Sequence, residues 1–186
     1  MAKELKKQNV SFKLTIAGSG KEEFTLKELA RELDVDDCIT FVGALSSEDT
    51  FSLMCGSDVF LATSNRKEGW GATINEAMAA GCAVVASNQI GAAPFLINPG
   101  VDGVIFRSES TKGLTDAVTA LLGDPDRLKA VAQAGVEKIR GSWSARSAAV
   151  RLIEISMQLL TKGSVTPFED GPLSVASVID EDWYLE

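Results

Sequence analysis

A glycine-bearing loop between two apolar strands constrains this sequence more than any other feature. Residues 59–62 (Val-Phe-Leu-Ala) and 83–86 (Ala-Val-Val-Ala) are continuous apolar runs. Such runs are typical of strands that are buried on both faces of a parallel sheet. Between them, a charged loop leads into a short alanine-rich helix that ends at Gly81. Because neighbouring parallel strands need a crossover connection, this strand–loop–helix–strand unit predicts an α/β fold.

The same alternation of strands and helices continues on both sides of this unit. A capping box formed by Ser46 and Asp49 predicts a helix that points Phe51, Met54 and Cys55 inward. We therefore expect a Rossmann-like parallel sheet with helices on both faces. The other expected strands are residues 11–17, 39–42 and 104–106. The other expected helices are residues 22–33, a helical turn at 92–97, a helix marked by Leu114 to Leu122, a helix at about 125–140, and a last helix capped by Ser144.

The length and charge distribution predict one domain followed by a tail. The chain has 186 residues, which suits one core and is too short for two ordinary domains. Residues 163–186 carry six acidic side chains, no basic side chain, two prolines and no periodicity. We therefore expect a domain over residues 1–162 and an extended acidic tail over residues 163–186. Trp183, Tyr184 and Leu185 are unusual in such a tail, which leaves open whether it docks on the domain.

Composition argues against several classes of function. The chain contains no histidine, which excludes Ser-His-Asp and Cys-His catalysis and argues against a structural zinc site. Its three cysteines are far apart in the sequence, so we interpret them as reduced thiols of a cytoplasmic protein. The net charge is −8, which is unfavourable for binding nucleic acid. No apolar run approaches the ~20 residues of a transmembrane segment, and no signal peptide opens the chain.

The loop and helix between the two apolar strands have the properties of an anion-binding site. Gly69 and Gly71 allow the backbone to turn tightly and to approach a ligand closely. The following helix directs its unpaired N–H groups and the positive end of its dipole toward the loop, which suits a phosphate. Glu68 lies in the loop and Glu76 about one turn into the helix, so both carboxylates can face one cleft.

The spacing Glu68-x7-Glu76, with Gly-Trp-Gly after the first glutamate and Ala-Met-Ala-Ala-Gly after the second, resembles the motif of the retaining glycosyltransferases of family 4, also called group 1. The resemblance implies the C-terminal half of a GT-B fold. It places Glu68 at the donor sugar as the catalytic residue and Glu76 at the ribose of the sugar nucleotide. The residues implied at the diphosphate are the loop Gly69, Trp70, Gly71, Ala72 and Thr73, with Arg66 and Lys67 as the nearby cations.

The resemblance covers roughly residues 13–150 and stops short of a whole enzyme. In the family, this domain begins one strand earlier, with an Arg and a Lys that hold the diphosphate, and an N-terminal domain binds the acceptor. We expect this chain to be inactive without that missing N-terminal acceptor domain. A second departure is Phe95, which follows Gly91-Ala92-Ala93-Pro94 where the family often has glutamate. It is expected to affect sugar or base preference more than reaction type.

The function implied by the resemblance is sugar transfer from a UDP-, GDP- or ADP-sugar with retention of anomeric configuration. We expect neither a cofactor nor a metal ion, because fixed N–H groups and cations can stabilise the leaving diphosphate. Two alternatives remain. One is a sugar-nucleotide epimerase, which shares the GT-B fold, although the lack of histidine and the glutamate spacing argue against it. The other is a non-catalytic nucleotide-binding or interaction module.

Overall fold

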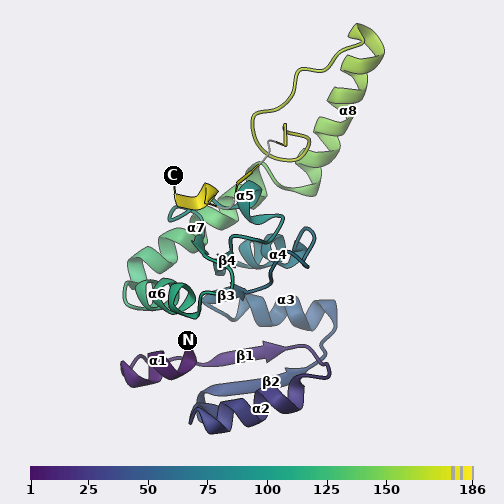
Figure 1. Ribbon diagram of the computed structural model, residues 1–186. Coiled ribbons are helices and arrows are strands. Elements are labelled where there is room, and N and C mark those ends of the chain that lie inside the picture. The colour runs from purple at the N-terminus through teal and green to yellow at the C-terminus, as the bar shows by residue number, and fades with distance from the viewer. Residues whose placement is uncertain (177–178, 181, 186) are drawn as a thin grey trace.

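The computed structural model describes residues 1–176, 179–180 and 182–185, and its ribbon is shown in Figure 1. In this part of the chain, short parallel strands alternate with helices as the sequence predicts. The strands are β1 (Leu14–Ala17), β2 (Ile39–Gly43), β3 (Val59–Ala62), β4 (Ala83–Ser87) and β5 (Val104–Phe106). The α-helices are α1 (Ala2–Lys7), α2 (Glu23–Glu32), α3 (Ser47–Cys55), α4 (Ala72–Ala80), α5 (Ala93–Leu96), α6 (Thr111–Leu122), α7 (Pro125–Gly141) and α8 (Ala145–Lys162), and the 3-10 helices are η1 (Asp36–Cys38) and η2 (Trp183–Leu185).

The strands form two parallel sheets where one continuous sheet was expected. β1 pairs with β2, and β3, β4 and β5 form a second sheet in that order. Val59 of β3 lies opposite Ala83 of β4, and Val85 of β4 lies opposite Val104 of β5. Among the described residues, no ladder of hydrogen bonds joins β1 to β3. The predicted α/β class with parallel strands is confirmed, but the sheet is interrupted between β1 and β3.

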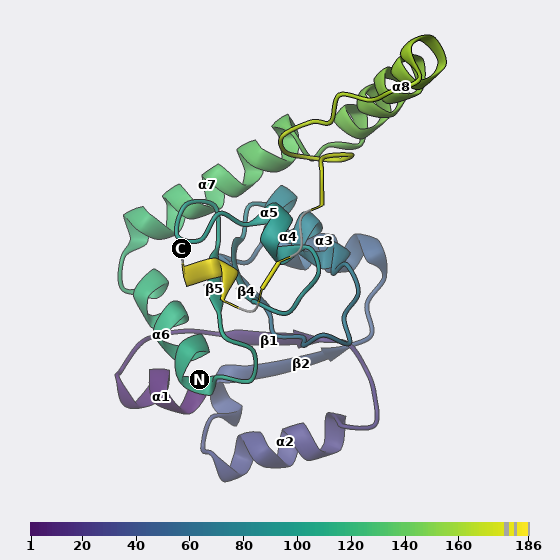
Figure 2. The same ribbon diagram turned by 45° about the horizontal axis from the view of Figure 1, so that its top comes forward.

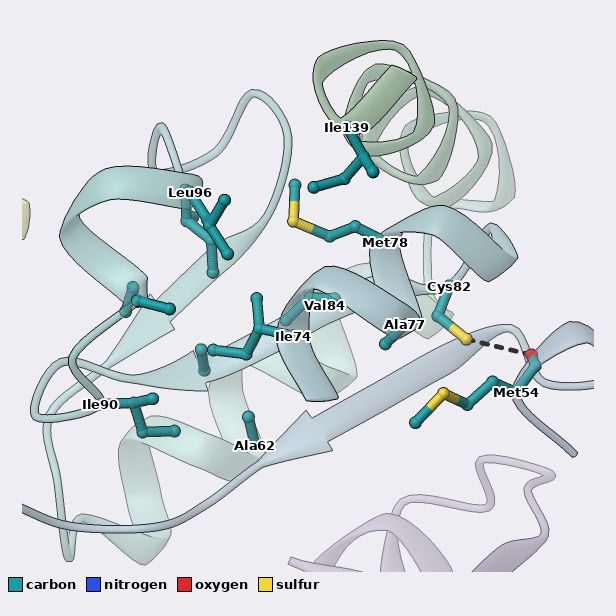
Figure 3. Packing of buried hydrophobic residues seen from close by; sticks show 14 residues of the cluster. Met54, Ala62, Ile74, Ala77, Met78, Cys82, Val84, Ile90, Leu96 and Ile139 are labelled. Atoms are coloured by element: carbon teal, nitrogen blue, oxygen red, sulfur yellow. Dashed lines mark hydrogen bonds between the residues drawn. The ribbon is translucent and has the colours of Figure 1, made fainter. Parts of the chain in front are cut away.

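The middle strand β4 separates two apolar clusters, one on each face of the second sheet. All five of its residues are fully buried. Val84 and Ala86 belong to the cluster beneath α4 and α5, which Figure 3 shows from close by. Ala83 and Val85 belong to the opposite cluster, whose other buried members are Leu5, Phe106, Val118, Leu121 and Val131. Helices therefore cover both faces of this sheet, and each buried valine contributes about 1.5–3 kcal/mol to folding.

Hydrogen bonds at the helix starts confirm several sequence predictions. Ser46 Oγ accepts from the backbone N–H of Asp49 at 3.0 Å, and Ser144 Oγ accepts from that of Ser147 at 3.1 Å. The predicted burial of α3 is wrong for Phe51 and Cys55, which are exposed, whereas Met54 is buried. The reason is that α3 packs mainly on α4, which covers Met54, whereas Phe51 lines a surface groove.

The C-terminal part of the chain extends away from the sheets and then returns to them. α8 projects from the domain in Figures 1 and 2 and has no buried residue, and Leu152, Ile153 and Leu160 are exposed on it. The tail folds back along this helix, where Thr166 donates its backbone N–H to Gln158 Oε1 at 2.7 Å. It reaches the domain again at η2. Of the helices described, none is both long enough and apolar enough to cross a membrane.

Candidate functional site

The candidate site is built on the loop that leads from β3 into α4. This loop lies at the carboxyl end of β3, the edge at which parallel α/β sheets bind their ligands. Gly71 starts α4 in the left-handed conformation, with φ 82° and ψ 55°. A Cβ atom at this position would lie 2.6 Å from Cγ2 of the buried Ile90. Both the backbone angle and the space beneath it therefore require glycine at the start of the helix.

A second loop, between β4 and α5, holds the first one in place through backbone contacts. Gly91 donates its N–H to the carbonyl oxygen of Gly69 at 3.1 Å, and Ala92 donates to that of Trp70 at 2.8 Å. A Cβ atom on Gly91 would lie 2.1 Å from the Gly69 oxygen, so only glycine allows this approach. Gly91 and Ala92 were missing from the predicted site residues, although a glycine just after a strand and a polar turn could have indicated a close backbone approach.

The first turn of α4 presents backbone N–H groups to the surface. Ala72 and Thr73 are exposed, and α4 has no side-chain cap. The N–H of Ile74 donates to the Gly71 oxygen at 2.9 Å. Within the described part of the chain, the N–H groups of Ala72 and Thr73 have no acceptor. Together with the positive end of the helix dipole, these donors favour an anion in front of the helix.

The two predicted glutamates lie on opposite sides of Gly71 in the chain and are both exposed. The side chain of Glu68 lies beside the start of α4, because a Cβ atom on Gly71 would be 3.6 Å from Glu68 Cγ. Glu76 is on α4 and lines a groove of ≈ 200 Å³ together with Leu45, Ser47, Thr50 and Phe51. Ser47 and Thr50, which the sequence analysis did not select, bring hydroxyl groups from α3 to this groove.

The predicted cations lie in the same loop and are exposed. The backbone N–H of Lys67 donates to Asn65 Oδ1 at 3.1 Å, which fixes the turn before Glu68. Arg66 lines a second groove of ≈ 330 Å³. The other residues of that groove are Asn88, Gln89, Ile90, Gly91, Pro94, Phe95, Ile179, Asp180 and Trp183. Residues 66–76 thus lie between two grooves, with Arg66 on one and Glu76 on the other.

The C-terminal tail contributes to the second groove. The indole Nε1 of Trp183 donates to the carbonyl oxygen of Asn88 at 3.2 Å, 95 residues away in the sequence. Trp183 also packs against the apolar cluster beneath α4 and α5. The question that the sequence left open is answered: the aromatic end of the tail docks on the domain, next to the candidate site.

The side chain of Trp70 is occupied by contacts within the protein. Its ring stacks on Phe95 with the centroids 5.8 Å apart and lies at the same distance from the ring of Trp143. Its Nε1 donates to Asn75 Oδ1 at 3.0 Å. The ring of Trp70 therefore holds α5 against the start of α4, and only the backbone of Trp70 is left to line the loop. Phe95, the residue that departs from the family motif, is the partner that makes this stack possible.

The metal-ligating chemistry of the site is limited. Across residues 1–176, 179–180 and 182–185, no group of three or more cysteine, aspartate or glutamate side chains is arranged to hold a metal ion.

The fully buried Cys82 donates its thiol hydrogen to the carbonyl oxygen of Met54 at 3.1 Å (Figure 3). Burial raises the pKa of this thiol to about 11, so it stays protonated at neutral pH and is a core residue.

Comparisons with known sequences match most of the chain. A sequence model of the family described as "Glycosyl transferases group 1" matches residues 1–138. A GDP-mannose-dependent alpha-(1-6)-phosphatidylinositol monomannoside mannosyltransferase of Mycobacterium tuberculosis is 32% identical over 147 residues, which are 76% of this chain and 38% of that protein. A D-inositol 3-phosphate glycosyltransferase of Nocardia farcinica is 32% identical over 130 residues, 69% of this chain and 28% of that protein. The chain therefore spans less than half the length of these relatives.

Solved structures with similar folds are glycosyltransferases. Sucrose-phosphate synthase from Thermosynechococcus elongatus superposes with a TM-score of 0.71 at 22% identity, covering 85% of this chain and 41% of that one. The C-terminal domain of a glycosyl transferase group 1 family protein from Francisella tularensis gives a TM-score of 0.61 at 21% identity, with 75% and 90% covered. At this identity the likeness concerns the fold alone, and it confirms the expected half of a GT-B fold.

Proposed function

We propose that this chain, which belongs to the glycosyl transferases group 1 family, is the donor-binding domain of a retaining glycosyltransferase that uses a nucleotide-diphosphate sugar. The observation that carries the proposal is the start of α4. There Gly71 takes a left-handed conformation over Ile90 and leaves the N–H groups of Ala72 and Thr73 exposed without a side-chain cap. An arrangement of this kind suits a diphosphate.

In this proposal the diphosphate lies in front of α4, between the two grooves. The N–H groups of the first helical turn donate to its oxygens, and the helix dipole favours its negative charge. Arg66 and Lys67 supply positive charge from the same loop. The contacts that Gly91 and Ala92 make with Gly69 and Trp70 hold the loop still, so the donors are already oriented before the ligand arrives.

The two glutamates take different parts of the donor. Glu76, one turn into α4 and beside a groove, accepts hydrogen bonds from the ribose hydroxyls through its ionised carboxylate. Glu68, beside the start of the helix, orients the sugar and stabilises the positive charge that develops at the anomeric carbon. A retaining hydrolase uses two carboxylates that flank the sugar bond. Here only Glu68 is assigned to the sugar, so we favour same-face attack by the acceptor, assisted by the leaving phosphate.

The donor class follows from the chemistry of the site and from the relatives. The mycobacterial relative is named as GDP-mannose-dependent, and Anabaena HepE, whose fold is similar, was solved with UDP and with UDP-glucose. A nucleotide-diphosphate sugar is therefore the donor class that we propose, with the base left to experiment. The epimerase alternative is not favoured, because the family and the similar folds are those of glycosyltransferases.

We further propose that the acceptor site lies outside this chain. The relatives are longer, and the matched region is their C-terminal part. The apolar side chains exposed along α8 would suit packing against such a missing N-terminal domain. Without that domain, half of the cleft is open to water, which screens the charges that hold the donor. The isolated chain should then bind a nucleotide diphosphate weakly and transfer no sugar.

The proposal is tested by calorimetric titration of the chain with UDP, GDP and ADP. At least one of them should bind, and Glu76→Ala should weaken that binding by about 1.5–3 kcal/mol, the usual range for hydrogen bonds to a charged group. The matched control is Glu32→Ala, which removes an exposed glutamate at the end of α2. Unchanged affinity in Glu76→Ala would remove Glu76 from the ribose, and binding of none of the three nucleotides would favour an interaction module.

A further inference from the structure

The first part of the C-terminal tail is held against α8 by one arginine. The guanidinium of Arg151 lies over the ring of Phe168, 4.5 Å from its centroid. It also donates to the carbonyl oxygen of Pro172 at 3.1 Å and to that of Asp170. Gly171, between these two residues, has φ 84°, and a Cβ atom there would meet the Arg151 guanidinium. The path of this segment is therefore specified by an arginine on α8 and a glycine in the tail.

The end of the tail is held a second time, on the domain. Trp183 donates its indole N–H to the carbonyl oxygen of Asn88 at 3.2 Å and packs against the apolar cluster beneath α4 and α5. Asp182 donates its backbone N–H to Asp180 Oδ1 at 3.0 Å, which fixes the Asp180 carboxylate in a turn. Figures 1 and 2 show η2, in yellow, on the domain and away from the far end of α8. The tail is thus attached at two separate places.

This attachment makes the tail part of the second groove. Ile179, Asp180 and Trp183 line the groove, and we call these three residues the tail wall. The other lining residues come from the loop before α4 and from the β4–α5 segment. The groove of ≈ 330 Å³ is therefore built jointly by the tail and by the two loops of the candidate site. Its volume lies at the lower end of the range of about 300–1,000 Å³ that is usual for small-molecule sites.

The position of the second groove fits the sugar end of the donor. In the proposed function, Glu76 holds the ribose beside the first groove, and the diphosphate lies in front of α4. A diphosphate carries the nucleoside at one end and the sugar at the other. Because residues 66–76 lie between the two grooves, a nucleoside beside Glu76 directs the sugar toward Arg66 and the second groove.

The lining of the second groove suits a sugar. A sugar ring has hydroxyl groups around its rim and C–H groups on its faces. Asn88 and Asp180 bring polar groups to the groove, whereas Phe95 and Trp183 bring aromatic rings. The exposed carboxylate of Asp180 has about four acceptor positions, of which the N–H of Asp182 uses one. The others can accept hydrogen bonds from sugar hydroxyls, and hydrogen bonds to a charged acceptor are the strong ones.

We propose that the tail wall is the outer side of the sugar pocket of the donor. Asp180 accepts hydrogen bonds from the hydroxyl groups of the sugar and so contributes to its selection. Trp183 is a positioning residue, because its contacts with Asn88 and with the apolar cluster hold Asp180 at the groove. The inference rests on the proposed function, since only a donor whose diphosphate lies in front of α4 brings a sugar to this place.

The experiment separates the sugar from the nucleotide by calorimetric titration with two matched pairs, GDP with GDP-mannose and UDP with UDP-glucose. Asp180→Asn removes the charge but keeps an oxygen that can accept the N–H of Asp182, so the turn should remain. Affinity for the bare nucleotide should stay within about twofold, as for a surface substitution. Affinity for the nucleotide sugar should fall about tenfold, as for one hydrogen bond to a charged group. The matched control is Asp182→Asn, because Asp182 is exposed and, among the described residues, is not one that lines the groove.

The indole N–H of Trp183 gives a local NMR signal at the same groove. The chain has three tryptophans, so the Trp183 signal can be assigned by its loss in Trp183→Phe. It should shift on addition of the nucleotide sugar and much less on addition of the bare nucleotide. Trp183→Phe should also lower the affinity for the nucleotide sugar more than that for the nucleotide. A role in stability alone would lower the melting temperature without separating the two ligands.

Four outcomes would overturn the proposal. Equal losses for nucleotide and nucleotide sugar in Asp180→Asn would mean that the tail supports the loops without touching the sugar. A gain for both ligands would make the tail a competitor of the diphosphate. Unchanged affinities together with an unmoved Trp183 signal would place the sugar elsewhere. If no nucleotide binds the unchanged chain, the proposed function itself fails and this inference falls with it, whereas the first three outcomes leave the proposed function standing.

Discussion

The substitution Gly91→Ala should disturb the candidate site while leaving every proposed ligand-binding residue unchanged. The added Cβ would lie 2.1 Å from the Gly69 oxygen and 3.1 Å from the Gly69 carbonyl carbon. Both are backbone atoms, which cannot move aside as the end of a flexible side chain can. To reach the 3.4 Å of an ordinary contact, the two loops must separate by about 1.3 Å. That movement would stretch the hydrogen bonds from Gly91 to Gly69 and from Ala92 to Trp70.

The expected losses follow from these two hydrogen bonds. Each contributes a net 0.5–1.5 kcal/mol, roughly, so the free energy of unfolding should fall by about 1–3 kcal/mol. For a chain of this size, the melting temperature falls by roughly 2–4 °C for each kcal/mol. Nucleotide affinity should fall on the order of 10- to 100-fold, because a shift of about 1 Å misaligns the N–H donors at the start of α4.

The assay is a thermal melt by circular dichroism, followed by calorimetric titration with the nucleotide that binds best. Gly141→Ala is the matched control, since a Cβ at that position would meet no atom within 4 Å. The control should keep the affinity and should not lower the melting temperature, because alanine forms helix more readily than glycine. If Gly91→Ala also kept both, the loops would be able to separate at no cost, and the contact at Gly69 would not position the site.

Three further predictions follow. In the complete enzyme, Glu68→Gln should lower turnover far more than nucleotide affinity, because its partner is the sugar, and equal losses would argue against a sugar-facing role. Lys138→Met should lower the free energy of unfolding, measured by urea titration, by about 3–5 kcal/mol. The reason is that the buried Asp102, 3.2 Å from Lys138 Nζ, loses its counter-charge. Adding Asp102→Asn to this variant should restore part of the loss. Burial raises the pKa of the Cys82 thiol from 9.0 to about 11. The preference of the folded state for the neutral thiol is therefore not felt as a loss of stability below pH 9. As the pH rises through 11, the free energy of unfolding should fall by about 2–3 kcal/mol. Urea titrations at pH 8 and 11 should therefore differ less in Cys82→Ala than in the unchanged chain.

The sequence predicted the elements that are defined by local patterns. The apolar runs of β3 and β4 and the glycine that ends α4 appear where their residue types place them. The caps at Ser46 and Ser144 also form as predicted, since a side-chain oxygen three residues before an N–H needs no distant partner. Residues 66–76 could be selected from the sequence as a candidate site because they are contiguous in the chain, and their role at a ligand stays a prediction.

The features that the sequence did not predict depend on contacts between distant segments. Gly91 positions Gly69 from 22 residues away, and its importance appears only when the two loops are seen together. Phe51 was expected inside from its spacing, but α3 packs mainly on α4, and Phe51 lines a surface groove instead. The interruption of the sheet has the same origin, because local periodicity identifies strands without specifying which of them pair.

The candidate site depends directly on the apolar core beneath it. Ile74, in the first turn of α4, is fully buried, and Ile90, in the loop after β4, lies under Gly71. Figure 3 shows both side chains in the cluster between α4 and the second sheet. The position of the N–H donors is therefore set by core packing, since α4 cannot shift without opening a cavity around Ile74. A core truncation such as Ile90→Ala, which removes the Cγ2 atom beneath Gly71 and normally costs about 2–5 kcal/mol of stability, should for this reason also loosen the turn at Gly71.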